Sequence, residues 1–240
     1  SKSTWLKWTA FAAARLGYSV LHIQLEGSEK ECFDKYSQIW SALDYTSVRN
    51  GNIPHALMDK LKKEAKMALN KGKDITIYSF EKFDEASMTD VRDIVLEYQK
   101  IKGKIPDLVV VDSLDLLHPG DGLKYGVDTQ SIKMKLQNSA KRMKNMAVEL
   151  KTRILTATQT GDVPPTIWND IDKVITRNNT EGDRTLVKSF SYVLTFNQTN
   201  DEQKTNEARI YIDKFRNYAV GKGVYKICTA YKFGRFYDRK

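Results

Sequence analysis

Residues 106–113 read PDLVVVDS, and this stretch decides the fold class. Its apolar residues, 108–111, follow one another without the polar alternation of a half-exposed strand, as in strands that are covered on both faces of a parallel sheet. Asp112 comes directly after them, so the strand carries a carboxylate at the carboxyl edge of the expected sheet. The stretch therefore predicts an α/β protein with a mainly parallel central sheet.

Segments of alternating type surround this strand and complete the expected architecture. Apolar spacing predicts helices over 4–15, 29–43, 54–69, 87–101 and 128–151, and strands over 18–25, 74–79 and 153–159. The helix that begins after residue 87 carries a capping box, Ser87-x-x-Asp90, at its start. Helices are therefore expected to flank the central sheet.

The chain changes character after Thr160. Loops rich in Pro, Asn, Asp and Gly separate strand-like segments at 186–199, 207–215, 223–231 and 234–240. We expect these strands to close the far side of the sheet as a β-rich C-terminal part. No internal repeat or low-complexity linker divides the sequence, so a single domain over residues 1–240 is predicted.

Composition limits the kind of protein. Of the 240 residues, 41% are hydrophobic and 29% are charged, which is ordinary for a soluble globular chain. The sequence contains no signal peptide and nothing near the roughly 18 consecutive apolar residues of a membrane span, so no membrane partner is expected. The net charge of +9 indicates either a polyanionic partner or a basic surface that serves solubility.

Cysteine and histidine usage argues against a metal site built from these residues. Cys32 and Cys228 are the only cysteines and form no CxxC pair, which favours reduced thiols. The histidines, His22, His55 and His118, lie far apart in the sequence.

The chain opens with SKST, residues 1–4, directly before a predicted helix. These residues match the end of the phosphate-binding pattern G-x-x-x-x-G-K-[ST], so residues 1–240 start inside that loop. In the pattern, Lys2 reaches the β/γ-phosphates and the Ser3 hydroxyl binds Mg²⁺. Ser1 stands where the final glycine belongs, and Ser1 to Thr4 form the candidate nucleotide-binding segment. Such tetrapeptides also occur by chance.

Two strand ends supply further candidates. Asp112 is placed to hold the water shell of Mg²⁺ opposite Ser3, a Walker B role; the alternatives are that it only starts a turn, or that Asp115 takes the role. Gln159 ends the predicted strand over 153–159, where its amide is suited to the γ-phosphate or an adjoining loop. A satisfied edge amide explains Gln159 equally well.

Taken in order, the segments SKST, LHIQLEGS, LVVVDS, ILTATQTG and IDKFRNYAVGKGVYKI resemble the RecA-like P-loop ATPase core of DnaB-type hexameric replicative helicases, including the phage branch. The resemblance extends from Lys2 to Asp238. It implies hydrolysis of ATP with Mg²⁺, a homo-hexameric ring on single-stranded DNA, and primase or a helicase loader as possible partners. It also implies the cytoplasm of a bacterial cell or a phage-infected host.

The resemblance carries roles to particular residues. QLEGSEKE resembles the family's strand that ends in its catalytic base, which implies that Glu26 activates water. DKFRNYAVG resembles the segment whose Lys and Arg reach the nucleotide of the neighbouring subunit, which implies that role for Lys214 and Arg216. It also implies that Gln159 couples the γ-phosphate to the DNA. Without the resemblance, Lys214 and Arg216 read as a solvated strand edge.

The segment after Gln159 departs from the family pattern, so DNA contacts cannot be transferred residue by residue. Positive charge in Gly- and Asn-rich loops suits a single-strand backbone, which makes Lys124, Arg177, Arg184 and Lys188 candidates. Ordinary exposed loop charges are the alternative for each of them.

Two other functions are also compatible with the sequence. A RecA- or KaiC-like recombination, repair or regulatory ATPase has the same fold. A nucleic-acid-binding module without catalysis is compatible with Ser1 in place of the glycine.

Overall fold

The structure is a computed structural model of the chain that describes residues 2–70, 74–80, 86–117, 129–161, 163–179, 186–216 and 223–239. The chain forms two compact units. The first unit comprises residues 1–123, 142–157 and 231–235, and the second comprises 124–141, 158–230 and 236–240. The single domain expected from the sequence stays a prediction.

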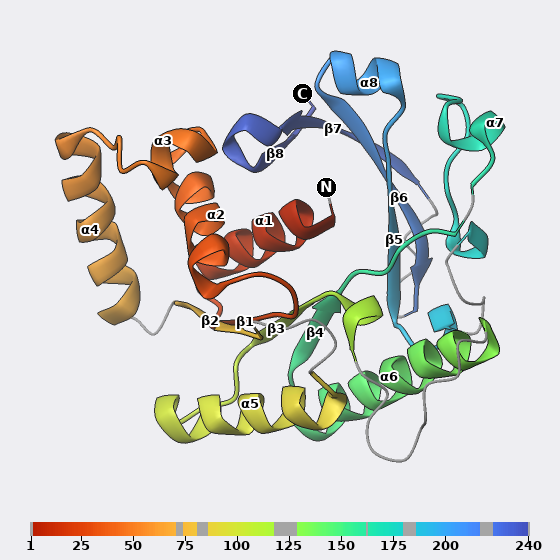
Figure 1. The fold of residues 1–240 in the computed structure, drawn as a ribbon, viewed down its shortest axis with the longest axis horizontal. Coiled ribbons are helices and arrows are strands. Elements are labelled where there is room, and N and C mark those ends of the chain that lie inside the picture. Colours follow the sequence, from red (N-terminus) through yellow and green to blue (C-terminus); the bar gives the residue numbers. More distant parts are fainter. Residues whose placement is uncertain are drawn as a thin grey trace. The chain divides into compact units, whose positions relative to one another are not determined.

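The first unit is built on a parallel sheet of four strands in the order β2-β1-β3-β4 (Figure 1). The strands are β1 (Val20–Gln24), β2 (Ile75–Ser79), β3 (Leu108–Asp112) and β4 (Arg153–Thr156). Within the pairing of β1 with β3, Gln24 lies opposite Asp112. The parallel arrangement predicted from the LVVVD strand is confirmed.

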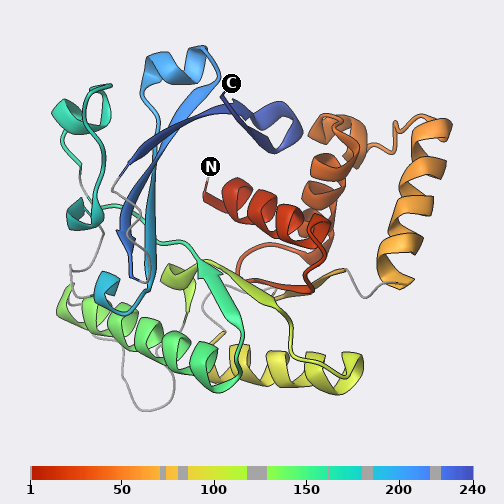
Figure 2. The ribbon, with the colours of Figure 1, turned by 180° about the vertical axis from the view of Figure 1, so that it is seen from behind.

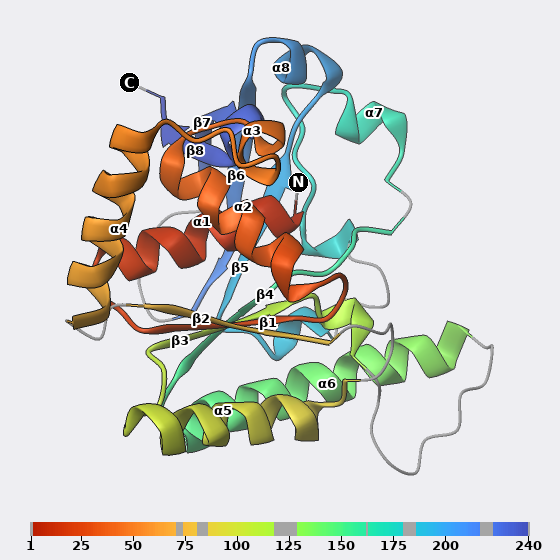
Figure 3. The same cartoon turned by 60° about the vertical axis from the view of Figure 1, so that its left-hand side comes forward.

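Helices cover both faces of this sheet (Figure 3). The helices of the first unit begin and end as follows: α1 (Lys2–Arg15), α2 (Glu29–Ser41), α3 (Tyr45–Arg49), α4 (His55–Asn70), α5 (Met88–Lys102) and α6 (Thr129–Glu149), of which residues 142–149 belong to this unit. Helices α1 and α2 lie on one face, and α5 with the end of α6 lies on the other.

Local signals explain where several of these helices begin. The Ser87 side chain accepts from the backbone of Asp90 while the Asp90 carboxylate accepts from the backbone of Ser87, so the predicted capping box is present. Ser28 and Glu31 form a second capping box at the start of α2. Helix α1 begins at Lys2, two residues before its predicted start at Thr4.

The core of the first unit lies between α1, α2 and the sheet. Its buried members are Leu6, Ala10, Val20, Cys32, Tyr36 and Val110. Because these side chains come from four elements, their burial fixes α1 against the strands and so fixes the position of residues 2–4.

The second unit contains its own four-stranded sheet, in the order β5-β6-β7-β8 (Figure 2). Its strands are β5 (Tyr192–Asn197), β6 (Glu207–Phe215), β7 (Val224–Ala230) and β8 (Arg235–Asp238). The pairs β5/β6 and β6/β7 are antiparallel. The predicted β-rich C-terminal part is confirmed, but its strands pair with their sequence neighbours in a separate sheet, so the prediction that they close the far side of the central sheet is wrong.

Short helical segments accompany this sheet. They are α7 (Pro165–Trp168) and α8 (Asn200–Lys204), with single 3₁₀ turns at Arg177–Asn179 and Leu186–Lys188. The strand predicted over 186–199 is thus too long. Its first residues form the second of these turns, in which Leu186 and Val187 are consecutively buried, a pattern that a one-sided strand does not produce.

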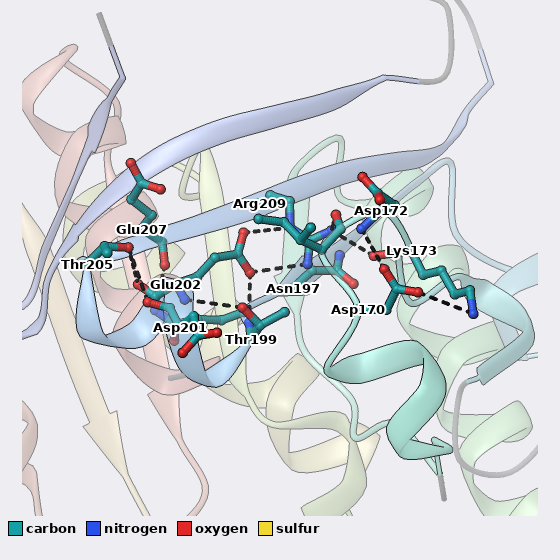
Figure 4. A network of polar contacts seen from close by, with 12 residues as sticks. Asp170, Asp172, Lys173, Asn197, Thr199, Asp201, Glu202, Thr205, Glu207 and Arg209 are labelled. Carbon is teal, nitrogen blue, oxygen red and sulfur yellow. Dashed lines mark hydrogen bonds and ion pairs between the residues drawn. The ribbon is translucent and has the colours of Figure 1, made fainter.

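A buried ion pair joins β6 to α8 in the second unit (Figure 4). Arg209 of β6 donates from Nε to Glu202 Oε1 at 2.7 Å and from Nη1 to the carbonyl oxygens of Ile171 and Lys173 at 2.5 and 2.7 Å. Burial raises the pKa of Glu202, but hydrogen bonds from Arg209 and from the Thr199 backbone outweigh it and leave the pKa below its ordinary value. Arg209 therefore holds the segment after α7 against β6.

Candidate functional site

The carboxyl ends of β1 and β3 lie side by side at one edge of the parallel sheet, which we call the β1–β3 edge. The chain leaves β1 towards α2 on one face of the sheet and leaves β3 towards α6, whose second half lies on the other face (Figure 3). In open α/β sheets, ligands bind where neighbouring strands send their connections to opposite faces.

Asp112 lies at this edge and is buried. The Ser3 hydroxyl donates to Asp112 Oδ1 at 3.0 Å, and Lys7 Nζ donates to Asp112 Oδ2 at 3.0 Å. The start of α1 therefore contacts the end of β3, and the structure brings together Ser3 and Asp112, the two residues that the sequence assigned to the metal.

Lys2 points to a different carboxylate. Its Nζ lies 3.5 Å from Asp115 Oδ2, in the turn that follows β3. Asp115, the rival of Asp112 in the sequence, thus pairs with the lysine that is expected to meet phosphate. Thr4 lines a cavity of about 70 Å³ between α1 and α2, together with Lys7 and Gly234. Ser1 lies outside the described residues.

Glu26 follows β1 by two residues and is exposed. The Leu25 N–H donates to the Asp112 carbonyl at 3.0 Å, so the hydrogen bonding between β1 and β3 continues past the last residue of β1 and brings Glu26 to the β1–β3 edge. Gly27 comes next at φ +90°, where a Cβ would lie 2.8 Å from Glu31 Oε2. A turn that requires glycine therefore directs the chain away immediately after Glu26.

Two polar residues at this edge were not predicted from the sequence. Lys7 is only 5% exposed, and its Nζ donates to Gln24 Oε1 at 2.9 Å as well as to Asp112. The Gln24 amide in turn donates to the carbonyl oxygen of Glu26. Two signals were available: Lys7 is one helical turn from Ser3, and the buried strand VLHIQ carries polar residues at alternate positions.

His22 is the other polar residue of that strand and is fully buried. Its Nδ1 lies 2.5 Å from the Tyr36 hydroxyl of α2. Burial lowers the pKa of His22 from 6.5 to about 3, and the positive charge of Lys7 adds to the effect. The ring is therefore neutral in the folded protein at physiological pH.

This neutral histidine predicts a pH dependence of stability. Below pH 6.5 the unfolded chain takes up a proton at His22 that the folded chain refuses until about pH 3, so the free energy of unfolding decreases as the pH falls through this window. The expected slope is about 1.4 kcal/mol per pH unit. Denaturant titrations at pH 6.5 and 5.0 measure it. His22→Gln should lose this slope while the exposed His55→Gln retains it; equal slopes in both variants would refute the assignment.

The remaining predicted residues lie in the second unit. Lys214 Nζ donates to the carbonyl oxygens of Val187 and Lys188 at 2.9 and 3.3 Å. Arg216 is exposed directly after β6, and Gln159 is exposed after β4. The roles that the sequence assigned to these residues stay predictions.

The candidate DNA-contacting residues are only partly described. Arg177 Nε lies 3.5 Å from Asp213 Oδ1, and Lys188 is exposed. Lys124 and Arg184 lie outside the described residues.

The donors at the β1–β3 edge fit a hard divalent cation. Ser3 and Asp112 offer a hydroxyl and a carboxylate oxygen, the ligand types that Mg²⁺ takes alongside water and phosphate oxygens. Among the described residues, no group of three or more His, Cys, Asp or Glu side chains is placed to hold a metal. A dedicated protein cage is thus not present in that part of the chain, and Mg²⁺ bound together with nucleotide phosphates does not need one.

Comparisons with known proteins identify the fold. A scan against protein-family models and a comparison with curated protein sequences both find no match. Among solved structures, an ATPase domain superposes with a TM-score of 0.76 at 15% sequence identity, over 99% of this chain and 80% of the other. A DnaB-like replicative helicase, solved with its interactions with primase, superposes with a TM-score of 0.76 at 16% identity.

The fold is therefore RecA-like, as the sequence predicted. The resemblance to the DnaB-type ATPase core is confirmed at the level of fold. The superposition with that helicase covers 100% of this chain and 55% of the helicase chain. No helix in the described ranges is long and apolar enough to cross a membrane.

Proposed function

We propose that the protein is an ATP-dependent replicative DNA helicase motor, which hydrolyses ATP at subunit interfaces to move along single-stranded DNA and unwind duplex. One observation carries the proposal: the hydroxyl of Ser3, at the start of α1, meets the carboxylate of Asp112, at the end of β3, at 3.0 Å. This is the arrangement in which a helix N-terminus receives phosphate beside a carboxylate that supports the metal. The fold shared with a DnaB-like replicative helicase supports the choice of reaction.

The first unit provides the proposed nucleotide site. Ser1, Lys2 and Thr4 bind phosphate oxygens, with Lys2 leaving Asp115 to do so. Ser3 and Asp112 hold Mg²⁺, which neutralises charge that develops on the phosphates. Glu26 accepts the proton of the attacking water from its exposed position at the β1–β3 edge.

The second unit provides the proposed coupling residues. Lys214 and Arg216 complete the site of a neighbouring subunit in a homo-hexameric ring, and Arg216 contributes the planar fork suited to phosphate. Lys214 has to leave the carbonyl oxygens of Val187 and Lys188 to reach that site. Gln159 couples the γ-phosphate to the DNA.

The proposed partners follow from the same assignment. Single-stranded DNA contacts Lys124, Arg177, Arg184 and Lys188 through its backbone. Primase or a helicase loader binds the ring in the cytoplasm of a bacterial cell or a phage-infected host.

The full-length protein tests the proposal directly. ATP hydrolysis is measured with and without single-stranded DNA, and unwinding is measured on a forked duplex. We expect DNA to stimulate hydrolysis and ATP to drive strand separation. Stimulated hydrolysis with strand exchange but no unwinding would favour a recombination ATPase. DNA binding without any ATP turnover would favour a binding module, and either result would refute the helicase assignment.

A further inference from the structure

Lys7 is a buried cation in a helix that otherwise packs apolar residues against the sheet. Its neighbours in the helix, Leu6 and Ala10, belong to the core. A buried ammonium group is costly unless it is paired and hydrogen-bonded. Lys7 meets that requirement through Asp112 at 3.0 Å and Gln24 at 2.9 Å, and the side chains of Lys7 and Asp112 are only 6% and 5% exposed.

Both partners of Lys7 lie at the β1–β3 edge. Gln24 ends β1, Asp112 ends β3, and the two lie opposite each other in the strand register. Gln24 uses its oxygen for Lys7 and its amide group for the carbonyl oxygen of Glu26. A single ammonium group therefore connects the proposed metal carboxylate to the segment that carries the proposed base.

The contacts also fix the orientation of the carboxylate. Asp112 Oδ1 accepts from Ser3, and Oδ2 accepts from Lys7. Because each oxygen has its own donor, the carboxylate cannot rotate without losing a buried hydrogen bond.

We propose that Lys7 is a positioning residue, an inference that rests on the proposed ATP hydrolysis. Lys7 holds Asp112 and Gln24 in one arrangement, so that the carboxylate and the Glu26 segment are in place before nucleotide binds. It also supplies, from inside the protein, the positive charge that balances Asp112. The nucleotide-free protein therefore needs no divalent cation at this edge to be stable.

The first test measures thermal unfolding of the full-length, nucleotide-free protein in EDTA and in millimolar Mg²⁺. The wild-type midpoint should be the same in both buffers. Lys7→Met leaves Asp112 buried without its cation, and we expect the midpoint in EDTA to fall by about 5–10 °C. Mg²⁺ should recover part of that loss. An unchanged midpoint, or a loss that Mg²⁺ does not reduce, overturns the charge-balance role.

Neutralising both partners separates charge from packing. In Lys7→Met/Asp112→Asn, neither side chain carries an unpaired charge. The midpoint of the double variant should therefore fall by much less than the sum of the decreases in the two single variants. Lys204→Met is the matched control, because Lys204 pairs with Asp201 on the surface of α8 at 2.8 Å, and their side chains are 75% and 89% exposed. Its midpoint should stay near that of the wild type. Additive losses in the double variant would contradict the pairing.

The second test measures hydrolysis by the folded variants. Misplaced reacting groups reduce turnover more than binding, so Lys7→Met should lower kcat by about tenfold or more while KM for ATP stays within about threefold. Lys7→Arg keeps the charge, and Lys7 is one of the residues that line the cavity of about 70 Å³. We expect it to regain most of the lost kcat. A folded Lys7→Met protein with wild-type kcat would reduce Lys7 to a structural residue.

The two tests distinguish failure of the proposed function from failure of the role proposed for Lys7. If the wild type does not hydrolyse ATP, the proposed function fails while the unfolding series still decides whether Lys7 balances Asp112. If the wild type hydrolyses ATP and Lys7→Met retains its kcat, the proposed function stands and the positioning role fails.

Discussion

Replacing Glu26 by Gln should leave ATP binding intact and slow ATP hydrolysis by a factor of about 100 or more. The amide has nearly the shape of the carboxylate but cannot accept a proton from water. Glu26 is exposed at the β1–β3 edge, and its backbone carbonyl is held by Gln24. The side-chain change therefore removes the proton acceptor without disturbing the backbone contact.

Equilibrium binding of ATP and steady-state hydrolysis with single-stranded DNA measure the two quantities separately. Glu29→Gln is the matched control, since Glu29 is an exposed glutamate three positions further on, in the first turn of α2. Its hydrolysis rate should equal that of the wild type. If Glu26→Gln hydrolyses ATP at the wild-type rate, Glu26 is not the base.

Replacing Arg209 by Met should lower the free energy of unfolding by about 3–5 kcal/mol, the usual loss when one partner of a buried ion pair is removed. The variant leaves the Glu202 carboxylate buried without its cation. It also removes the hydrogen bonds to the carbonyl oxygens of Ile171 and Lys173, which connect the segment after α7 to β6 (Figure 4).

Denaturant unfolding at pH 7 measures this loss. The second unit offers its own control: Arg239 also pairs with a glutamate, Glu207, at 3.1 Å, but the side chains are 45% and 29% exposed. Arg239→Met should therefore cost less than about 1 kcal/mol. Equal losses in the two variants would show that burial of the Arg209 pair does not matter.

The architecture of the first unit was predictable because its signals are local. LVVVD has the uninterrupted apolar pattern of a strand covered on both faces, and Ser87 with Asp90 specifies where a helix begins. The second unit was less predictable. The strands after residue 190 alternate between apolar and polar residues, and this alternation does not indicate which strand each one pairs with. Their separate sheet could therefore not be distinguished from an extension of the first sheet.

The candidate site divides in the same way. Ser3, Asp112 and Glu26 could be named as candidates from the sequence, because Ser3 opens a helix and the two carboxylates follow strand ends. Lys7 could not, because a lysine in a short helix reads as a surface residue until its neighbours are known. The pairing of Lys2 with Asp115 was equally hidden, as were the carbonyl contacts of Lys214.

Strand type, several helix starts and the position of carboxylates at strand ends follow from the sequence alone, since each depends on residues within one or two turns of each other. Which charges are paired depends instead on the tertiary structure. Lys7 and Asp112 are 105 residues apart, and their salt bridge exists because α1 packs on one face of the sheet with its start near the carboxyl ends of β1 and β3. Lys7 becomes the counter-ion of Asp112 because it is buried, and its burial results from the packing of α1 against the sheet.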